Sequence, residues 1–144
     1  RSTVPDLTNP TQVTAGFSHS CAIDDSGVVC WGNSAGDRLA IPTLSNPLQV
    51  RAGVAHTCAV DATGVVCWGS NSVKQSTVPS TLKNPRSVTV GTDHTCANDD
   101  SGLVCWGSNR NGKRIVPVLN MVRDTDSDGV DDIVDNAPLD ADIQ

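Results

Sequence analysis

The chain has 144 residues and a formal net charge of −6, the size of one domain with at most a short appendage. Residues 1–120 carry a net charge of +1, whereas residues 121–144 carry eight Asp against Arg123 and a net charge of −7. Neither part has the basic character that nucleic-acid binding needs, and no apolar run reaches the length of a membrane span. The sequence therefore predicts neither a nucleic-acid partner nor a membrane-spanning segment.

Three segments of the chain are nearly superimposable: HSCAIDDSGVVCWG (19–32), HTCAVDATGVVCWG (56–69) and HTCANDDSGLVCWG (94–107). Their His residues lie 37 and then 38 positions apart, and the same offsets hold for both Cys and for the Trp of each segment. An Asn-Pro dipeptide and a Gly precede each segment at matching positions. Such regularity predicts three copies of one structural unit, at about residues 2–38, 39–75 and 76–114, followed by the start of a fourth.

Each unit is expected to form four short strands, which in the first unit cover residues 11–15, 19–24 and 28–32 and, weakly, 39–41. Apolar residues occur on both faces of the middle pair, so these strands should be sandwiched between layers. Stacked four-stranded units with a period near 40 residues are typical of β-propeller blades. The predicted fold of residues 1–120 is all-β, a partial β-propeller of three four-stranded blades; a parallel β-helix is the alternative.

The six Cys form three pairs with the same C-x8-C spacing. A hairpin with the loop Asp24-Asp25-Ser26-Gly27, and Gly27 in the left-handed conformation, would place Cys21 opposite Cys30 at a distance that a disulfide spans. The same symmetry predicts Cys58–Cys67 and Cys96–Cys105. Free buried thiols, or a metal site using the His two residues before each first Cys, are the alternatives. Disulfides imply an oxidising compartment: extracellular, cell-surface or periplasmic.

The repeat pattern V-x-A-G-x-x-H-[ST]-C-A-x-[DN]-x-x-G-x-[VL]-C-W-G resembles the repeat of regulator-of-chromosome-condensation propellers, in their short cysteine-bearing bacterial form. The stretch WGSNRNGK (106–113) also resembles that family's W-G-x-N-x-x-G-Q signature, whereas WGNSAGDR (31–38) departs from it. The resemblance covers about residues 2–119 and implies a propeller, usually of seven blades. It leaves the function open, because the family includes a chromatin-bound exchange factor, a secreted β-lactamase inhibitor and surface proteins.

Three blades cannot close a ring, since propellers typically need four to eight. The chain also begins within a repeat, because Ser2-Thr3-Val4-Pro5 matches Ser76-Thr77-Val78-Pro79. We expect either a fragment of a larger propeller or self-association, with two copies closing a six-bladed ring.

The acidic segment of residues 121–144 contains the sequence DTDSDGVDDIVDNAP (124–138). Counting Asp124 as position 1, oxygen ligands fall at the EF-hand positions 1, 3, 5, 7, 9 and 12, and Gly129 falls at position 6. The predicted calcium ligands are the side chains of Asp124, Asp126, Asp128, Asp132 and Asp135 and the backbone carbonyl of Val130. A solvated, disordered acidic tail is the alternative.

The same segment resembles the thrombospondin type-3 repeat, D-x-D-x-D-G-x-x-D-x-x-D-N-x-P, from Asp124 to Pro138. Ala137 stands where many members of that family have Cys. The resemblance implies calcium in an extended, ion-stabilised rod, often in tandem copies.

The recurring His19, His56 and His94 could act as general bases or metal ligands, but a His beside a disulfide in every repeat is better explained as a structural hydrogen-bonding residue. The Trp of each repeat is likewise expected to pack between blades. We therefore predict no catalysis. The preferred function is a binding or structural module of a secreted or surface-anchored bacterial protein with a protein partner; a secreted enzyme inhibitor and a lectin-like or enzymatic propeller are the alternatives.

Overall fold

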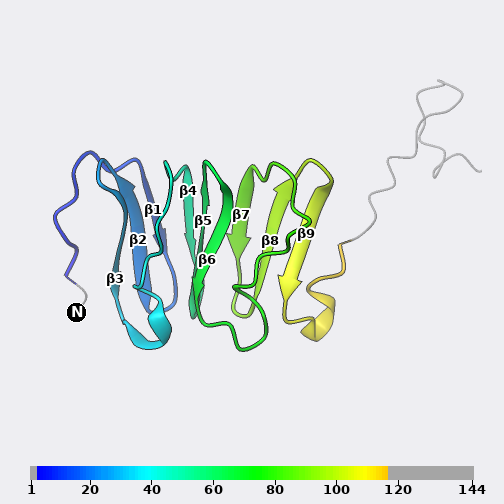
Figure 1. The fold of residues 1–144 in the computed structure, drawn as a ribbon. Coiled ribbons are helices and arrows are strands. Elements are labelled where there is room, and N and C mark those ends of the chain that lie inside the picture. Colours follow the sequence, from blue (N-terminus) through cyan, green and yellow to red (C-terminus); the bar gives the residue numbers. More distant parts are fainter. Residues whose placement is uncertain (1–2, 117–144) are drawn as a thin grey trace, which may run out of the picture.

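The structure, a computed structural model, describes residues 3–116 of the chain, and it consists of three antiparallel sheets of three strands each (Figure 1). The sheets stand side by side in sequence order, and we call them blades 1, 2 and 3. Their elements are β1 (Gln12–Ala15), β2 (His19–Asp24) and β3 (Gly27–Gly32); β4 (Gln49–Ala52), β5 (His56–Asp61) and β6 (Gly64–Gly69); and β7 (Ser87–Val90), β8 (His94–Asp99) and β9 (Gly102–Gly107). Two 3-10 turns, η1 (Ala35–Asp37) and η2 (Arg110–Gly112), follow blades 1 and 3.

The hairpin between the second and third strand of each blade has the predicted register. Cys21 pairs with Cys30 and Ile23 with Val28, and the two other blades repeat this pairing. Asp24 also pairs with Gly27, so the loop has two residues rather than the expected four. The φ of Gly27 is +111°, a value that L side chains rarely adopt, which explains a Gly at this position of every repeat.

All six Cys form disulfides within their own blades, as predicted: Cys21–Cys30, Cys58–Cys67 and Cys96–Cys105. The bonded residues lie directly opposite each other on neighbouring strands, with Cα–Cα distances of 4.1, 4.1 and 4.0 Å. The alternatives of free thiols and of a cysteine metal site are therefore wrong. Three disulfides indicate an oxidising environment.

The prediction of four strands in each blade is wrong, because each described sheet has three. The segment expected to form the fourth strand of the first unit, residues 39–41, is irregular. The amide of Ile41 donates to the carbonyl of Leu39, and Pro42 has no amide hydrogen, so the segment cannot form a ladder. Its apolar side chains are used instead for packing, since Ile41 and Leu44 lie against the core between blades 1 and 2.

The core lies between the blades, in two clusters that differ only by Ile23 in the first and Val60 in the second. Cys21 and Ile23 of blade 1 pack against Val50, Ala59 and Trp68 of blade 2. The second cluster repeats these positions between blades 2 and 3, with the residues Cys58, Val60, Val88, Ala97 and Trp106. Each blade thus has a leading face toward the preceding blade and a trailing face toward the next one. Strand β5 of the middle blade is buried along its whole length, which confirms the expected sandwiched strand.

The blades approach each other closely at the loop that follows the first strand. A Cβ atom added to Gly16 would collide with the carbonyl oxygen of Gly53, and one added to Gly53 would collide with that of Gly91. The amide of Phe17 donates to the Gly53 carbonyl oxygen at 3.2 Å. Glycine is therefore required here by the spacing of the blades. In the described residues, no helix has the length and apolar character that crossing a membrane requires.

Candidate functional site

Two of the three recurring His residues, His19 and His56, connect one blade to the next. The Nε2 atom of His19 lies 2.7 Å from the Thr57 hydroxyl, and that of His56 lies 2.8 Å from the Thr95 hydroxyl. The Thr95 hydroxyl donates its hydrogen to the carbonyl oxygen of Gln75, so Nε2 of His56 must be the donor in its own hydrogen bond. These hydrogen bonds confirm the structural interpretation for His19 and His56.

Burial keeps these imidazole rings neutral. His56 is completely buried, and this burial, together with the neighbouring His94 and His19, lowers its pKa to about 4. Burial and then the nearby Arg38 also lower the pKa of His19. A neutral ring that donates from Nε2 links two blades without placing an unpaired charge in the core. The buried Nδ1 atoms of both rings have no hydrogen-bond partner.

The Trp of each following blade makes a second connection. The indole Nε1 of Trp68 donates to the carbonyl oxygen of Arg38 at 2.8 Å, and that of Trp106 donates to Gln75 at 3.0 Å. Both Trp residues are buried, which confirms their expected position between blades.

A third connection was missed by the sequence reasoning. The side-chain oxygen of Gln12 accepts from the amide of Val50 at 3.0 Å, while its nitrogen donates to the Val50 carbonyl oxygen. Gln49, which lies 37 positions later, accepts from the amide of Val88 at 2.7 Å. The signal in the sequence was a Gln at the same position of two successive repeats.

An Asp at the end of the second strand of each blade ties the hairpin to the segment that enters the blade. In blade 1, one carboxylate oxygen of Asp24 accepts from the amide and hydroxyl of Ser26, and the other accepts from the amide of Thr8. The hydrogen bonds from the Ser26 hydroxyl and then from Thr8 lower the pKa of Asp24. Asp61 and Asp99 repeat this arrangement, so three of the eight Asp outside the tail are structural.

Charge is separated between the two ends of the strands. We call the end with η1 and η2 the loop end and the opposite one the hairpin end (Figure 1). Between residues 3 and 116, Asp outnumber the basic residues at the hairpin end, where Asp24, Asp25, Asp61, Asp99 and Asp100 lie at the same end as Lys83 and Arg86. The balance is reversed at the loop end, where the described cations Arg38, Lys74, Arg110, Lys113 and Arg114 lie at the same end as Asp37 and Asp93. The loop end is thus a positively charged surface on a nearly neutral body.

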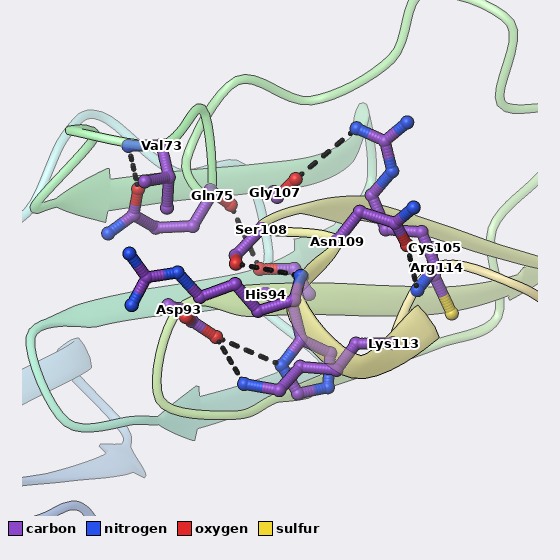
Figure 2. A network of polar contacts seen from close by, with 12 residues as sticks. Val73, Gln75, Asp93, His94, Cys105, Gly107, Ser108, Asn109, Lys113 and Arg114 are labelled. Carbon is purple, nitrogen blue, oxygen red and sulfur yellow. Dashed lines mark hydrogen bonds and ion pairs between the residues drawn. The ribbon is translucent and has the colours of Figure 1, made fainter.

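Local hydrogen bonds hold part of this positive charge in place (Figure 2). The ammonium group of Lys113 lies 2.9 Å from the Asp93 carboxylate, and this contact, more than any other, lowers the pKa of Asp93. The Arg114 guanidinium donates to the carbonyl oxygen of Gly107 at 3.3 Å, and the Arg114 amide donates to the Asn109 side chain. Lys113 and Arg114 are therefore presented by an ordered loop.

Exposed apolar side chains accompany the cations at the loop end. Phe17, the single Phe of the chain, follows β1 and is 83% exposed, and Val73 is 41% exposed. The repeats carry Val54 and Thr92 at the positions equivalent to Phe17. The Arg38 guanidinium donates to the hydroxyl of Ser18, the residue after Phe17, at 2.8 Å. An exposed aromatic residue near an Arg has the composition of a binding hot spot.

The predicted calcium ligands, from Asp124 to Asp135, lie outside the described residues. Between residues 3 and 116, no group of three or more His, Cys, Asp or Glu is placed to hold a metal ion.

The geometry is that of β-propeller blades, and solved structures support this. The ectodomain of the Physcomitrella patens receptor kinase CR4 matches with a TM-score of 0.61 and 26% identity over 69% of this chain and 30% of that one. The CRINKLY WD40 ectodomain of the Arabidopsis thaliana receptor kinase ACR4 matches with a TM-score of 0.58 and 27% identity over 73% of this chain and 38% of that one. Prp20p of Saccharomyces cerevisiae matches with a TM-score of 0.60 and 19% identity over 72% of this chain and 32% of that one.

Two of the three repeats match a known family model. The family described as the regulator of chromosome condensation (RCC1) repeat matches residues 11–35 and 48–75. These two repeats are similar to RCC1 repeats and carry one disulfide each, and the chain spans about a third of the length of the solved structures that it matches. Among curated proteins, no sequence matches the chain significantly.

Proposed function

We propose that the chain is a non-enzymatic binding module of a secreted or cell-surface bacterial protein, and that its loop end contacts a protein partner with an acidic surface. The observation that carries this proposal is the exposed Phe17 at the same end of the strands as the five loop-end cations. The residues best suited to catalysis support it too, because His19 and His56 are already committed to contacts between blades. Three disulfides suit a position outside the cytoplasm.

The similar architecture of Prp20p supports a role in protein binding, since that protein was studied for its binding to Gsp1p and histones. The three blades of this chain cover only part of such a propeller, so the partner of the whole protein follows from neither the fold nor the repeat type. The inhibitor and the lectin-like or enzymatic alternatives stay predictions from the sequence.

Capture of partners from the envelope and secreted fractions of the source organism tests the proposed surface. We expect at least one partner to bind the wild-type chain, to be released by salt and to be lost with Phe17→Ser/Arg110→Ser. Leu48→Ser/Lys83→Ser is the matched control, because it removes one exposed apolar residue and one cation from the hairpin end. Equal capture by both variants would place the binding surface elsewhere.

We also propose that residues 121–144 bind calcium through Asp124, Asp126, Asp128, Asp132, Asp135 and the Val130 carbonyl. The support is the EF-hand spacing of the carboxylates with Gly129 at the turn. Calorimetric titration of the full chain with calcium should show binding that Asp124→Ala/Asp128→Ala abolishes. Asp140→Ala/Asp142→Ala removes the same charge outside the loop and should leave binding intact. Equal titrations of both variants would contradict the site.

A further inference from the structure

Both junctions between blades are made by the same contacts, which define what each face of a blade must offer. A trailing face contributes the Gln side chain, the His ring and an aliphatic residue, which is Ile23 in blade 1 and Val60 in blade 2. A leading face contributes a Val, a Thr hydroxyl and the Trp. The two end faces of the described stack, which are the leading face of blade 1 and the trailing face of blade 3, can be compared with these two sets of contact residues.

The leading face of blade 1 has the full set of contact residues, and none of the described residues forms a blade against it. Val13 occupies the position of Val50 and Val88 and is 69% exposed, whereas those two are 0% and 3% exposed. Ser20 supplies the hydroxyl at the Thr position and is half-buried. Trp31 is half-buried as well, whereas Trp68 is 7% exposed. This face is ready to receive a trailing face like those of blades 1 and 2.

The trailing face of blade 3 lacks two of the three contact residues, the Gln and the aliphatic residue. Ser87 stands where blades 1 and 2 have Gln12 and Gln49, so its side chain is too short to reach the backbone of a further blade. Asn98 stands where they have Ile23 and Val60, and it is exposed. Burying Asn98 without a hydrogen-bond partner would be unfavourable.

The third contribution, the His ring, is turned back onto its own blade. A Cβ atom added to Gly91 would collide with the ring of His94, in the place that the glycine carbonyl oxygen of the next blade takes at the two junctions. The Nδ1 atom of His94 lies 3.6 Å from the Asp93 carboxylate, which also binds Lys113 (Figure 2). Ser18 and Ala55 stand at the position of Asp93 in the other blades, so this polar cluster is specific to blade 3.

We infer that the stack has one docking end and one closed end. The leading face of blade 1 binds a further blade of the same repeat type, one whose trailing face carries Gln, His and Ile or Val. The trailing face of blade 3 is a polar end that does not bind such a blade, as terminal repeats with a polar outer face keep stacked repeat proteins in solution. Closure of two copies into a six-bladed ring would have to bury Asn98 against Val13, so it is disfavoured.

Restoring the missing residues on blade 3 tests this asymmetry. In Ser87→Gln/Asn98→Ile, the trailing face of one copy should match the leading face of another and cause head-to-tail association. Sedimentation of the full chain should show the wild type near its monomer mass of 15.0 kDa, and the variant should associate at a concentration at least tenfold lower than the wild type. Adding Val13→Asn to the variant should restore the monomer, because it removes the aliphatic contact on the opposite face.

Three results would overturn the inference: a wild type that associates as strongly as the variant, a variant that stays monomeric, or association that survives Val13→Asn. Should the double variant not fold, a chain with residues 11–47 duplicated in tandem provides a second test. Two duplicated chains are compared, one with both copies unchanged and one with Gln12→Ser/Ile23→Asn in its first copy. The unchanged chain should have the higher urea midpoint. Equal midpoints would contradict the docking face.

Discussion

Replacing His56 with Gln tests whether the neutral rings between blades set the stability of the stack in mild acid. His56 is fully buried with its pKa lowered to about 4, so the folded chain resists protonation of this ring. In the unfolded chain the ring takes its ordinary pKa of about 6.5. A lowered pKa contributes stability that is present above pH 6.5 and is lost as the pH falls toward 4.

The size of this loss follows from the two pKa values. Between pH 7 and pH 5, proton linkage at His56 alone lowers the free energy of unfolding by about 2 kcal/mol. A domain of this size should have a urea dependence of about 1.5 kcal/mol per M, so the midpoint should fall by about 1.3 M. The Asp carboxylates with lowered pKa values titrate below this window, which separates the two effects.

Urea unfolding with the disulfides intact, followed by the fluorescence of the buried Trp68 and Trp106, measures this directly. We expect His56→Gln to be less stable than the wild type at pH 7 but to lose about 2 kcal/mol less on going to pH 5. His94→Gln is the control, because it removes only the smaller, electrostatic part of the lowering of the His56 pKa and leaves the burial of His56 in place. This variant should keep most of the pH dependence. A His56→Gln variant that loses as much stability as the wild type would show that protonation of His56 does not cause the pH dependence.

Three further predictions concern stability. Trp68→Ala should lower the free energy of unfolding by about 3–5 kcal/mol, and Trp31→Ala by clearly less, because Trp68 fills the core between blades whereas Trp31 lies on an open face. Denaturant titration measures both losses, and equal losses would contradict this difference in packing. Cys58→Ser/Cys67→Ser should lower the free energy of unfolding by about 2–3 kcal/mol, because the unfolded chain is no longer restricted by the short disulfide loop. The same titration measures this loss, and an unchanged midpoint would show that the disulfide does not stabilise the fold. The hydrogen bond from the Ser101 hydroxyl is the main cause of the lowered pKa of Asp99, which contributes stability that is present above pH 4 and is lost as the pH falls below it. Asp99→Asn should therefore lose less stability than the wild type between pH 5 and pH 2. An acid unfolding curve as steep as that of the wild type would argue against the Asp99 contacts.

The repeat made most of the fold predictable. Because the same residues recur at a fixed offset, one hairpin must suit all three repeats. The apolar residues around Cys21 and Cys30 therefore predicted the hairpin register, and with it the disulfide. The missing fourth strand could not be foreseen from the apolar residues alone. Ile41 is apolar because it packs between blades, and an apolar residue that packs from an irregular segment looks the same in a sequence as one in a strand.

The candidate site was less predictable, because it depends on which side chains meet across blades. The roles of Gln12 and Asp24 follow from contacts with backbone amides, and a backbone amide leaves no trace in the sequence. Their recurrence in the repeat was the available signal. The positive loop end was hidden for another reason: a net charge of +1 for the body conceals two ends of opposite sign, which only the strand order separates.

Hydrogen exchange of the full chain, with and without a captured partner, tests the central claim that binding occurs at the loop end. We expect slower exchange in the loops around Phe17, Val73 and Lys113, with the hairpins around Asp25 and Asp100 unchanged. Protection at the hairpin end, or none at the loop end, would contradict it.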